Sequence, residues 1–356
     1  MPLNQPSSAL LNASWKRILI SHVIGAAGGA IFYYFSLPLP WMLGAMLFTF
    51  TAVMLGLPAQ TIHKLRTPVI AIIGVMLGSG FTAEILASAG GWIVSLAFLA
   101  FYMAVAAALL VPIYTRIGGY DRSTAYFAAM PGGVNDMVII GEAMGADGRR
   151  IALAHAARIV ITIAVVAFWF RVVLGLEVSG NLSNGNYDPM GLRDFLLMTG
   201  CAVFGTMMGK KLKFPAHALL GPMVLSALVH VTDMTHSVPP SLLVNICQVF
   251  LGTALGVRFV GTPKGMVARS MRLSFVATLI TLALTLIFAV AFHTLFNQTT
   301  EQVILAYAPG GLTEMSLVAL SMGADVAYIS VHHLARITMV IAFAPIILKL
   351  MLRRGI

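Results

Sequence analysis

Residues 130–158 read MPGGVNDMVIIGEAMGADGRRIALAHAAR, and residues 308–336 repeat the pattern as APGGLTEMSLVALSMGADVAYISVHHLAR. The acid of the first copy, Asp136, returns as Glu314 in the second copy. A helix breaker beside an acid, occurring twice in a hydrophobic chain, is typical of the core of a membrane transporter. The positions of the first copy that recur 178 residues later (130 to 308) are Pro131, Gly132, Gly133, Met137, Met144, Gly145, Ala146, Asp147, His155, Ala157 and Arg158.

The composition excludes an ordinary soluble protein. Hydrophobic residues make up 59% of the 356 residues, charged residues make up 10%, and the mean hydropathy is +0.92. A soluble globular protein carries about 25% charged residues. Apolar runs such as Trp92–Tyr114, Val276–Phe296 and Ile337–Leu352 approach the roughly 20 residues that cross a bilayer as a helix. The sequence therefore predicts an all-α polytopic membrane protein surrounded by membrane lipid.

The net charge of +10 does not indicate a nucleic-acid partner. The basic residues lie in short loops between apolar segments, as the positive-inside rule requires. Met1–Ser14 is polar and lacks a cleavable signal pattern, so we expect the first span to act as its own signal. The two cysteines, Cys201 and Cys247, lie in apolar segments and suggest no disulfide or metal framework. The sequence has no nucleotide-binding loop, catalytic triad or haem motif, so we expect no cofactor, no metal and no enzymatic activity.

The duplication extends over almost the whole chain. We therefore divide the chain into two repeats, residues 1–178 and 179–356. Each repeat holds six apolar segments, and the fifth segment carries the Pro-Gly-Gly break. Further matching pairs are Leu37 with Phe214, Pro38 with Pro215, Leu43 with Leu220, Gly44 with Gly221, Met46 with Met223, Gly74 with Gly252, Gly78 with Gly256 and Phe81 with Phe259.

The lysines and arginines predict which segments cross the membrane. If the broken fifth segment of each repeat enters and leaves on the same side, 18 basic residues are cytoplasmic and two, Arg171 and Arg193, are outside. If all six segments cross, the count is 11 against 9, and a re-entrant third segment gives 12 against 8. Orientation follows this charge bias. We therefore expect about ten spans: two inverted five-span repeats, each with a re-entrant hairpin, and both termini in the cytoplasm.

The Pro-Gly-Gly segments interrupt their helices. Proline removes a backbone donor and clashes with the preceding turn, and glycine allows backbone angles that other residues resist. At membrane depth the freed backbone groups need protein, water or a ligand as partners. A plain kink is the alternative, but the duplication beside an acid favours a binding role for Pro131, Gly132, Gly133, Pro309, Gly310 and Gly311.

Charged side chains within the predicted spans are further candidates for function, because a charge at the bilayer centre costs about 2.5–3.5 kcal/mol on insertion scales. Asp136 and Glu314 follow the breaks, and Arg158 and Arg336 lie 22 residues after the acids. Three interpretations stay open: ion pairs within or across repeats, a purely structural role for such pairs, or a midplane site for an anion or a coupling ion. The neutral residues that precede the acids, Asn135 and Thr313, are also candidate binding residues.

Two further pairs of residues recur near the arginines. His155 and His333 lie one turn before them and either form a proton relay, because histidine titrates near neutral pH, or pack as hydrogen-bonded residues. Asp147 and Asp325 precede the last helix of each repeat and predict helix N-caps. Four Gly-xxx-Gly pairs predict close helix packing, and the third segment of each repeat carries one at an equivalent position.

The duplicated PGG…M…GAD…R block and the repeated LG(A/P)M segments, at Leu43–Met46 and Leu220–Met223, resemble the AbrB-type family of bacterial membrane proteins. The resemblance extends from about Ile18 to Leu352. It implies a multi-pass protein of the bacterial inner membrane, of a kind often labelled as a transporter and sometimes as an ammonia monooxygenase or a regulator of gene expression. The soluble DNA-binding protein of the same name is unrelated.

We therefore expect a secondary transporter of a small solute, with an anion as the favoured class, coupled to an ion or a proton. In this hypothesis the acids bind the proton or cation, and the arginines attract the solute or steady the acids. The alternative is a membrane regulator or sensor that acts without transport, although the longest hydrophilic stretch, about Glu177–Asp194, is too short for a signalling domain. A membrane enzyme is a third class, and a homo-oligomer stays open.

Overall fold

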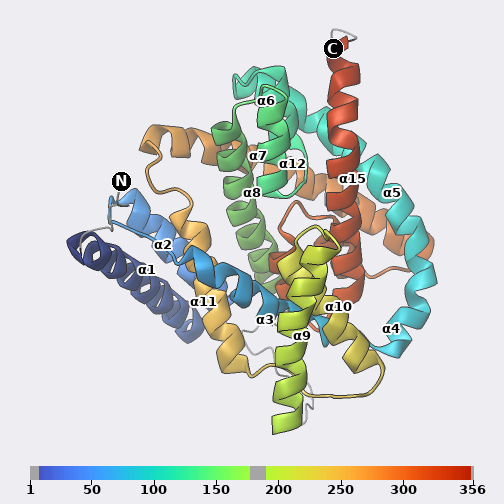
Figure 1. Ribbon diagram of the computed structural model, residues 1–356. Coiled ribbons are helices and arrows are strands. Elements are labelled where there is room, and N and C mark those ends of the chain that lie inside the picture. Colours follow the sequence, from blue (N-terminus) through green and yellow to red (C-terminus); the bar gives the residue numbers. More distant parts are fainter. Residues whose placement is uncertain (1–7, 177–189, 354–356) are drawn as a thin grey trace.

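The computed structural model describes residues 8–176 and 190–353. In these two ranges every regular element is a helix, which confirms the predicted all-α class (Figure 1). The predicted boundary between the repeats, at 178/179, and most of the hydrophilic stretch Glu177–Asp194 lie outside the described residues.

The main helices of the two halves follow the same order, and the first half contains additional short elements. In the first half they are α1 (Ser8–Tyr34), η1 (Pro40–Gly44), α2 (Ala45–Met54), η2 (His63–Leu65), α3 (Arg66–Gly78), α4 (Ala83–Ser88), η3 (Ala89–Gly91), α5 (Trp92–Pro112), η4 (Ile113–Ile117), α6 (Arg122–Ala129), α7 (Val134–Ala143), α8 (Gly148–Phe168) and η5 (Trp169–Val173). In the second half they are α9 (Leu192–Lys211), α10 (His217–Val231), α11 (Ser241–Val257), α12 (Lys264–Phe296), α13 (Thr300–Tyr307), α14 (Leu312–Ser321) and α15 (Val326–Arg353).

The duplication seen in the sequence is also present in the helices. α6 and α7 begin and end 178 residues before α13 and α14, and α8 begins 178 residues before α15. Each Pro-Gly-Gly break separates two short helices, so the predicted interruption is present in both halves. We call residues 122–143 the first hairpin and residues 300–321 the second hairpin.

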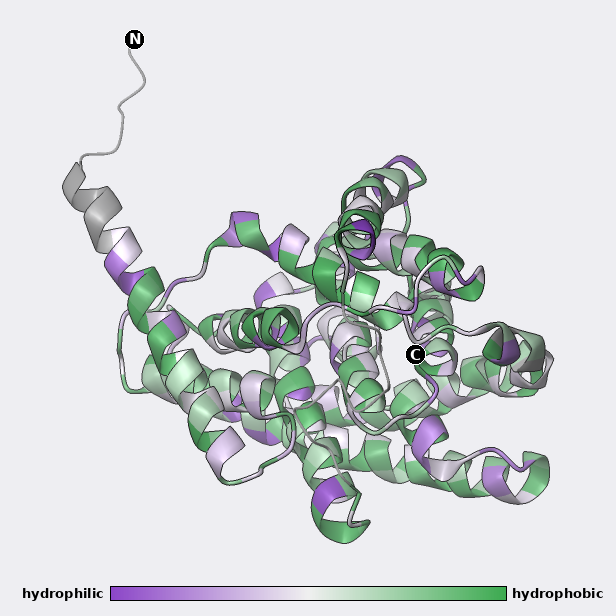
Figure 2. Cartoon of the chain, turned by 90° about the horizontal axis from the view of Figure 1, so that it is seen from below, coloured by the Kyte–Doolittle hydropathy of each residue, from purple (hydrophilic) through white to green (hydrophobic). Residues whose placement is uncertain are grey.

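Within the described residues, five helices are long and apolar enough to cross a membrane: Ser14–Tyr34, Ala89–Ile117, Gly148–Val173, Lys264–Phe296 and Val326–Leu352. Shorter apolar helices of 10–17 residues lie between them, and hydrophobic residues predominate along most of the helices (Figure 2). Many large hydrophobic side chains are exposed. This arrangement is consistent with a membrane protein. The number of spans and their orientation stay predictions.

The first three helices of each half interlock. α3 packs on α10, and its counterpart α11 packs on α2 in the reciprocal way. A β-carbon added at Gly74 of α3 would lie 2.5 Å from the carbonyl oxygen of Leu219, and the counterpart Gly252 lies against the carbonyl of Met42. The close packing predicted for the Gly-xxx-Gly pairs of the third segments is therefore confirmed. We call α1–α3 and α9–α11 together the interlocked bundle.

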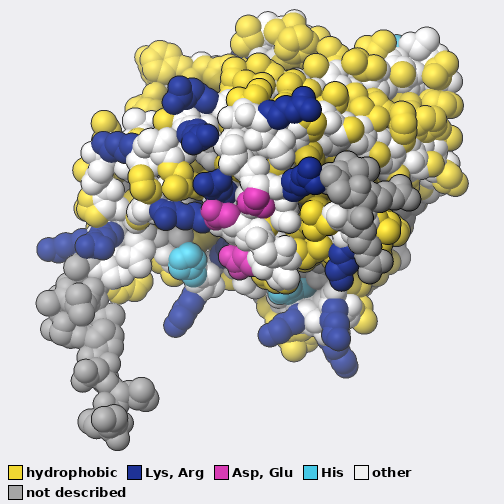
Figure 3. All heavy atoms as spheres, turned by 90° about the horizontal axis from the view of Figure 1, so that it is seen from above, with side chains coloured by type: hydrophobic (Ala, Val, Ile, Leu, Met, Phe, Trp, Pro, Cys, Tyr) yellow, Lys and Arg dark blue, Asp and Glu magenta, His cyan; other side chains and the backbone are white. Residues whose placement is uncertain are grey.

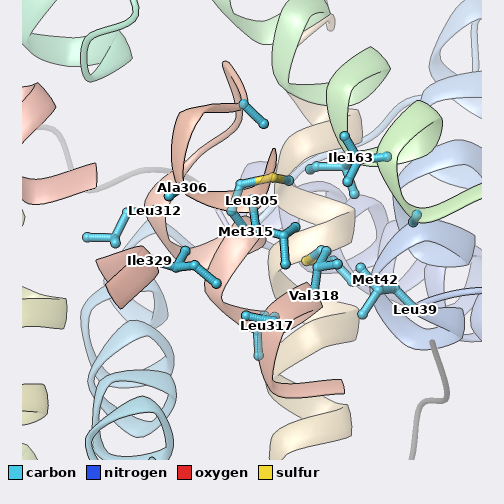
Figure 4. Packing of buried hydrophobic residues seen from close by; sticks show 14 of the residues in the cluster. Leu39, Met42, Ile163, Leu305, Ala306, Leu312, Met315, Leu317, Val318 and Ile329 are labelled. Atoms are coloured by element: carbon cyan, nitrogen blue, oxygen red, sulfur yellow. The ribbon is translucent and has the colours of Figure 1, made fainter. Parts of the chain in front are cut away.

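The remaining long helices and the two hairpins form a second unit, the hairpin bundle, of α5–α8 and α12–α15. Here α12 packs on α8 and α13, and α15 packs on α13, α14 and α5. Its core contains Met315, Leu317 and Val318 of α14, which meet Met42 of the interlocked bundle and Ile163 of α8 in one hydrophobic cluster (Figure 4). Between the bundles, the main helix contact in the described chain is that of α14 with α3.

Each hairpin enters and leaves at one end of the molecule. The Oγ1 of Thr124, at the start of the first hairpin, accepts a 2.8 Å hydrogen bond from the amide of Asp147, just after its end. In the second hairpin the counterparts Gln302 and Asp325 are joined side chain to side chain at 3.4 Å. The broken segments are therefore true hairpins rather than kinked rods.

The two hairpins start from opposite ends of the hairpin bundle. The end of α5 and the start of α12 lie beside the first hairpin, where Arg269 donates to the carbonyl of Gly118 at 3.0 Å. The start of α5 and the end of α12 lie beside the second hairpin, where Gln298 donates to the carbonyl of Gly91 at 3.3 Å. The counterparts α5 and α12 therefore run in opposite directions.

We call the end formed by residues 118–122, 147–150 and 261–269 the basic end, and the end formed by residues 298–302 and 325–328 the opposite end. Figure 1 draws α6 and the C-terminal end of α15 at the top, on the basic end. Figure 3 looks onto this end and shows many Lys and Arg side chains around it. Arg122, Arg149, Arg150, Lys264 and Arg269 belong to the basic end.

Candidate solute-binding site

The tips of the two hairpins meet in one cavity of about 470 Å³ between the two bundles. The hairpin bundle supplies both breaks, both acids and both buried arginines, and the interlocked bundle supplies the starts of α3 and α10 and the end of α11. All twelve predicted binding residues line this cavity: Pro131, Gly132, Gly133, Asn135, Asp136, Arg158, Pro309, Gly310, Gly311, Thr313, Glu314 and Arg336.

The backbone at each break is extended. Met130 and Gly133 have ψ angles of 134° and 136°, and Ala308 and Gly311 have ψ angles of 143° and 152°. Glycine is the N-cap of both α7 and α14, so no side-chain cap satisfies the first backbone amides of these two helices. Two helix N-termini, the positive ends of the helix dipoles, therefore face the cavity.

Both acids fold back over the N-terminus of their own helix. Asp136 and Glu314 occupy the third helical position after the N-caps Gly133 and Gly311. A β-carbon on Gly133 would lie 2.5 Å from Oδ2 of Asp136, and one on Gly311 would overlap Oε2 of Glu314. The second glycine of each break therefore leaves room for the carboxylate.

The first glycine of each break packs on a methionine. A β-carbon on Gly132 would lie 2.8 Å from the sulfur of Met137, and one on Gly310 would lie 2.8 Å from the sulfur of Met315. Both methionine side chains are fully buried. This contact explains why methionine recurs at the same distance after each Pro-Gly-Gly.

The two buried arginines bind backbone carbonyls. Arg158 donates to the carbonyls of Ala128, Ala129 and Met130 at 3.1–3.3 Å, at the end of α6. Arg336 does the same at the end of α13, with carbonyls of Tyr307, Ala308 and Gly310 at 2.7–3.4 Å. A cation at a helix C-terminus satisfies orphan carbonyls and opposes the helix dipole.

Ion pairs between these arginines and the acids are one of the three interpretations that the sequence leaves open, and the described residues do not form them. Within the described residues, the structure pairs neither Asp136 nor Glu314 with an arginine within 4.0 Å, and the one ion pair is Arg150 with Asp147 at 3.2 Å. The physical reason is the break itself: the unpaired carbonyls that it creates are the nearer acceptors. Arg158 and Arg336 hold the hairpin tips together.

The histidines orient the arginines. Nε2 of His155 lies 2.9 Å from the carbonyl of Phe127, and Nε2 of His333 lies 2.9 Å from the carbonyl of Leu305. Both rings are fully buried. Their other nitrogen, Nδ1, faces the guanidinium, so both ring nitrogens are occupied. This geometry favours the packing role over the proton relay, and neither histidine lines the cavity.

The predicted N-caps are confirmed. The carboxylate of Asp147 accepts from the amide of Arg150 at 3.1 Å, and that of Asp325 accepts from the amide of Tyr328 at 2.9 Å. At the start of the first hairpin, Asp121 caps α6 through the amide of Thr124 at 2.9 Å. Partial burial raises the pKa of Asp121, but its hydrogen bonds with Thr124 outweigh this and hold the pKa below the ordinary value. This cap therefore stabilises the fold above the ordinary pKa of aspartate and weakens as the pH falls through the lowered value.

Four polar residues of the cavity wall are not among the predicted binding residues. Arg66 and Thr67 start α3, His217 starts α10, and Arg258 follows α11. The duplication could not reveal the two arginines, because the counterpart of Arg66 is a valine and that of Arg258 is a glycine. Basic residues between apolar segments predict loops. Only the position of the start of α3 and the end of α11 beside the hairpin tips places these two arginines in the cavity.

Long apolar helices around a polar cavity, entered by two hairpins, define a class of protein: a helical, membrane-like protein with a duplicated sequence and a central cavity. The chain belongs to the family described as "Transition state regulatory protein AbrB", which matches residues 41–352. The confirmed resemblance therefore covers most of the chain.

Two relatives extend along nearly the same length. The chain is 24% identical over 347 residues to the uncharacterized protein YhjN of Bacillus subtilis (strain 168), and the match covers 90% of each chain. It is 25% identical over 326 residues to a protein of Escherichia coli (strain K12) whose name is AbrB, a candidate regulator, and this match covers 88% of the present chain and 90% of the relative.

Proposed function

We propose that the protein is a secondary transporter of a small anionic solute, coupled to a proton or another cation. The observation that carries the proposal is the meeting of two duplicated, interrupted hairpins in one polar cavity. A volume of about 470 Å³ is within the range of small-molecule sites, roughly 300–1,000 Å³. Broken helices at the centre of a membrane protein commonly bind the substrate or the coupling ion.

We propose further that the halves are inverted repeats in a membrane of about ten spans. The opposite directions of α5 and α12, and the opposite ends from which the hairpins start, support this arrangement. The cluster of basic residues supports a cytoplasmic basic end, by the positive-inside rule. The compartment would then be the inner membrane of a bacterium, with both termini in the cytoplasm.

The two bundles offer a route to alternating access. The cavity lies between them, and the hairpin bundle contains both binding tips, whereas the interlocked bundle is held together by backbone contacts at glycines. A rigid interlocked bundle and a hairpin bundle that moves against it would expose the cavity first to one side and then to the other. The limited contact between the bundles, mainly α14 with α3, favours such motion.

Asp136 and Glu314 are the groups that we propose for coupling. Both are half-buried, line the cavity, and have no ion-pair partner within 4.0 Å in the described chain. A carboxylate at this depth is stabilised when it binds a proton or a cation. The coupling ion and the solute would share one site, which links their binding.

The test is uptake by the purified protein in proteoliposomes. We expect an imposed proton or sodium gradient to drive uptake of at least one small carboxylate or phosphate, and the double variant Asp136→Asn with Glu314→Gln to abolish it. Glu142→Gln is the matched control, because Glu142 is an exposed acid of α7 outside the cavity wall. Unchanged uptake in the double variant, or no gradient-driven uptake by the wild type, would reject the proposal.

A membrane regulator or sensor is the second candidate, favoured by the names of the family and of the Escherichia coli relative. It requires a partner that carries the signal onward. Crosslinking in cells separates the two: a stable cytoplasmic protein partner, with no solute movement in proteoliposomes, would favour regulation. We propose no enzymatic activity for this chain.

A further inference from the structure

Two arginines outside the duplicated pattern flank one half of the cavity. Arg66 and Arg258 line the main cavity and also a side pocket of about 130 Å³, which opens beside Thr313 and Glu314. Asp136 does not reach this side pocket. The two halves of the site therefore differ in charge, although their hairpins are nearly identical.

Neither Arg66 nor Arg258 forms an ion pair within the part of the chain that the structure describes. In residues 8–176 and 190–353, no carboxylate lies within 4.0 Å of the guanidinium of Arg66 or Arg258. The charges that act on Arg258 are those of Arg66, which repels it, and of Glu314, which attracts it. Two like charges held at one cavity wall are costly unless an anion joins them.

The terminal nitrogens of the other two arginines of the cavity already have hydrogen-bond partners, and Nε of each is buried without one among the described residues. Arg158 and Arg336 are 3% exposed and bind carbonyls at the hairpin tips. The uncapped N-terminus of α14 adds partial positive charge at Glu314, in the same half as Arg66 and Arg258. This half therefore combines the N-terminus of α14 with two accessible guanidinium groups, whereas those of Arg158 and Arg336 are buried.

We propose that Arg66 and Arg258 form the binding site for the oxyanion group, a carboxylate or phosphate, of the solute. Guanidinium groups suit this role because they bind planar or tetrahedral oxyanions with paired hydrogen bonds. Glu314 then competes with the solute for the same two arginines. This inference rests on the proposed transport function. It assigns recognition of the anion to Arg66 and Arg258 instead of Arg158 and Arg336.

The asymmetry also divides the roles of the acids. Loss of the Glu314 charge removes the competitor and strengthens anion binding, whereas loss of the Asp136 charge has a smaller effect, because Asp136 lies outside the side pocket. An anion that enters beside a protonated Glu314 would be bound together with that proton. Binding of an anionic solute would in this way be coupled to binding of a proton.

The experiment measures binding by purified protein in detergent, from the rise in melting temperature with inorganic phosphate, sulfate, succinate and citrate. We expect at least one of these anions to stabilise the wild type. Arg66→Gln and Arg258→Gln should each raise its dissociation constant at least ten-fold, with partial rescue by Arg66→Lys. Lys64 is an exposed basic residue that does not line the cavity, so Lys64→Gln should change the dissociation constant less than two-fold. Glu314→Gln should lower the dissociation constant.

If none of the four anions stabilises the wild type, or if the double Arg66→Gln and Arg258→Gln variant binds within two-fold of it, the inference is overturned. The melting temperature without anion shows whether each variant is folded, and the exposed Arg66 provides a test if Arg258→Gln does not fold. Binding as expected without flux would reject transport and keep the site. Anion flux that persists in the double variant would reject the site and keep transport.

Discussion

Arg158 donates a hydrogen bond to Nδ1 of His155, 2.9 Å away, and Arg336 makes the same bond to His333 in the second half. A guanidinium can only donate, so Nδ1 accepts, and the carbonyl beyond the ring requires a proton on Nε2. Both rings are therefore neutral. Each histidine fixes an arginine across the end of an interrupted helix, and this unit holds the hairpin tip in place.

Replacing His155 with phenylalanine should lower stability. The substitution keeps the ring but leaves a guanidinium donor and the Phe127 carbonyl without partners, at a cost of about 1–3 kcal/mol for each buried group. The melting temperature in detergent measures this loss. His236→Phe is the control because His236 is exposed, and it should change the melting temperature little. Equal effects of the two substitutions would contradict the positioning role.

Asp136→Asn should leave stability nearly unchanged, within about 0.5 kcal/mol as for a substitution outside a buried network. The terminal nitrogens of Arg158 donate to carbonyls and not to Asp136, so Arg158 loses no hydrogen bond when the carboxylate is neutralised. If Asp136 and Arg158 formed a buried ion pair, the same substitution would cost about 3–5 kcal/mol. Chemical denaturation of the wild type and the variant in the same detergent distinguishes these two values.

Gly133→Ala and Gly311→Ala should impair ligand binding more than stability. The added methyl group meets the end of a flexible acidic side chain, which can swing away at little cost but then leaves its place over the helix N-terminus. We expect at least a ten-fold loss of gradient-driven uptake with a small change in melting temperature. Gly265→Ala is the control, because nothing lies within 4 Å of its added methyl group. Normal uptake in both break variants would show that the position of the carboxylate does not matter.

Gly78→Ala should have the opposite profile and destabilise the fold itself. Its added methyl group would lie 2.5 Å from the carbonyl oxygen of Met223, and backbone cannot move aside as a side chain can. Overpacking of this kind costs typically about 1–3 kcal/mol. The melting temperature, compared again with Gly265→Ala, measures the loss. A stability equal to that of the control would mean that the bundle is looser than its glycine contacts indicate.

Much of the fold follows from repetition and hydropathy. The Pro-Gly-Gly breaks, the Asp147 cap and the contact of Gly74 with its neighbouring helix follow from local rules: proline and glycine interrupt helices, aspartate caps them, and paired glycines allow close approach. The same local patterns occur in both halves, so two separate stretches of sequence lead to the same prediction.

The electrostatic part of the site could not be predicted in the same way. An ion pair of Arg158 with an acid is one of the three interpretations that the sequence leaves open, but the break beside Arg158 exposes carbonyls to which it donates instead. Arg66 and Arg258 have no counterparts in the other half, so the duplication gave no signal for them. Their place in the cavity depends on the packing of one bundle against the other, which local sequence does not encode.

The most direct test of the central claim is cysteine labelling of the two hairpin bases in intact cells. In a background without Cys201 and Cys247, Thr299→Cys reports the base of the second hairpin and Arg149→Cys reports that of the first; both positions are exposed. We predict that a membrane-impermeant maleimide labels Thr299→Cys in intact cells and Arg149→Cys only after permeabilisation. Labelling of both from the same side would contradict the meeting of two oppositely inserted hairpins.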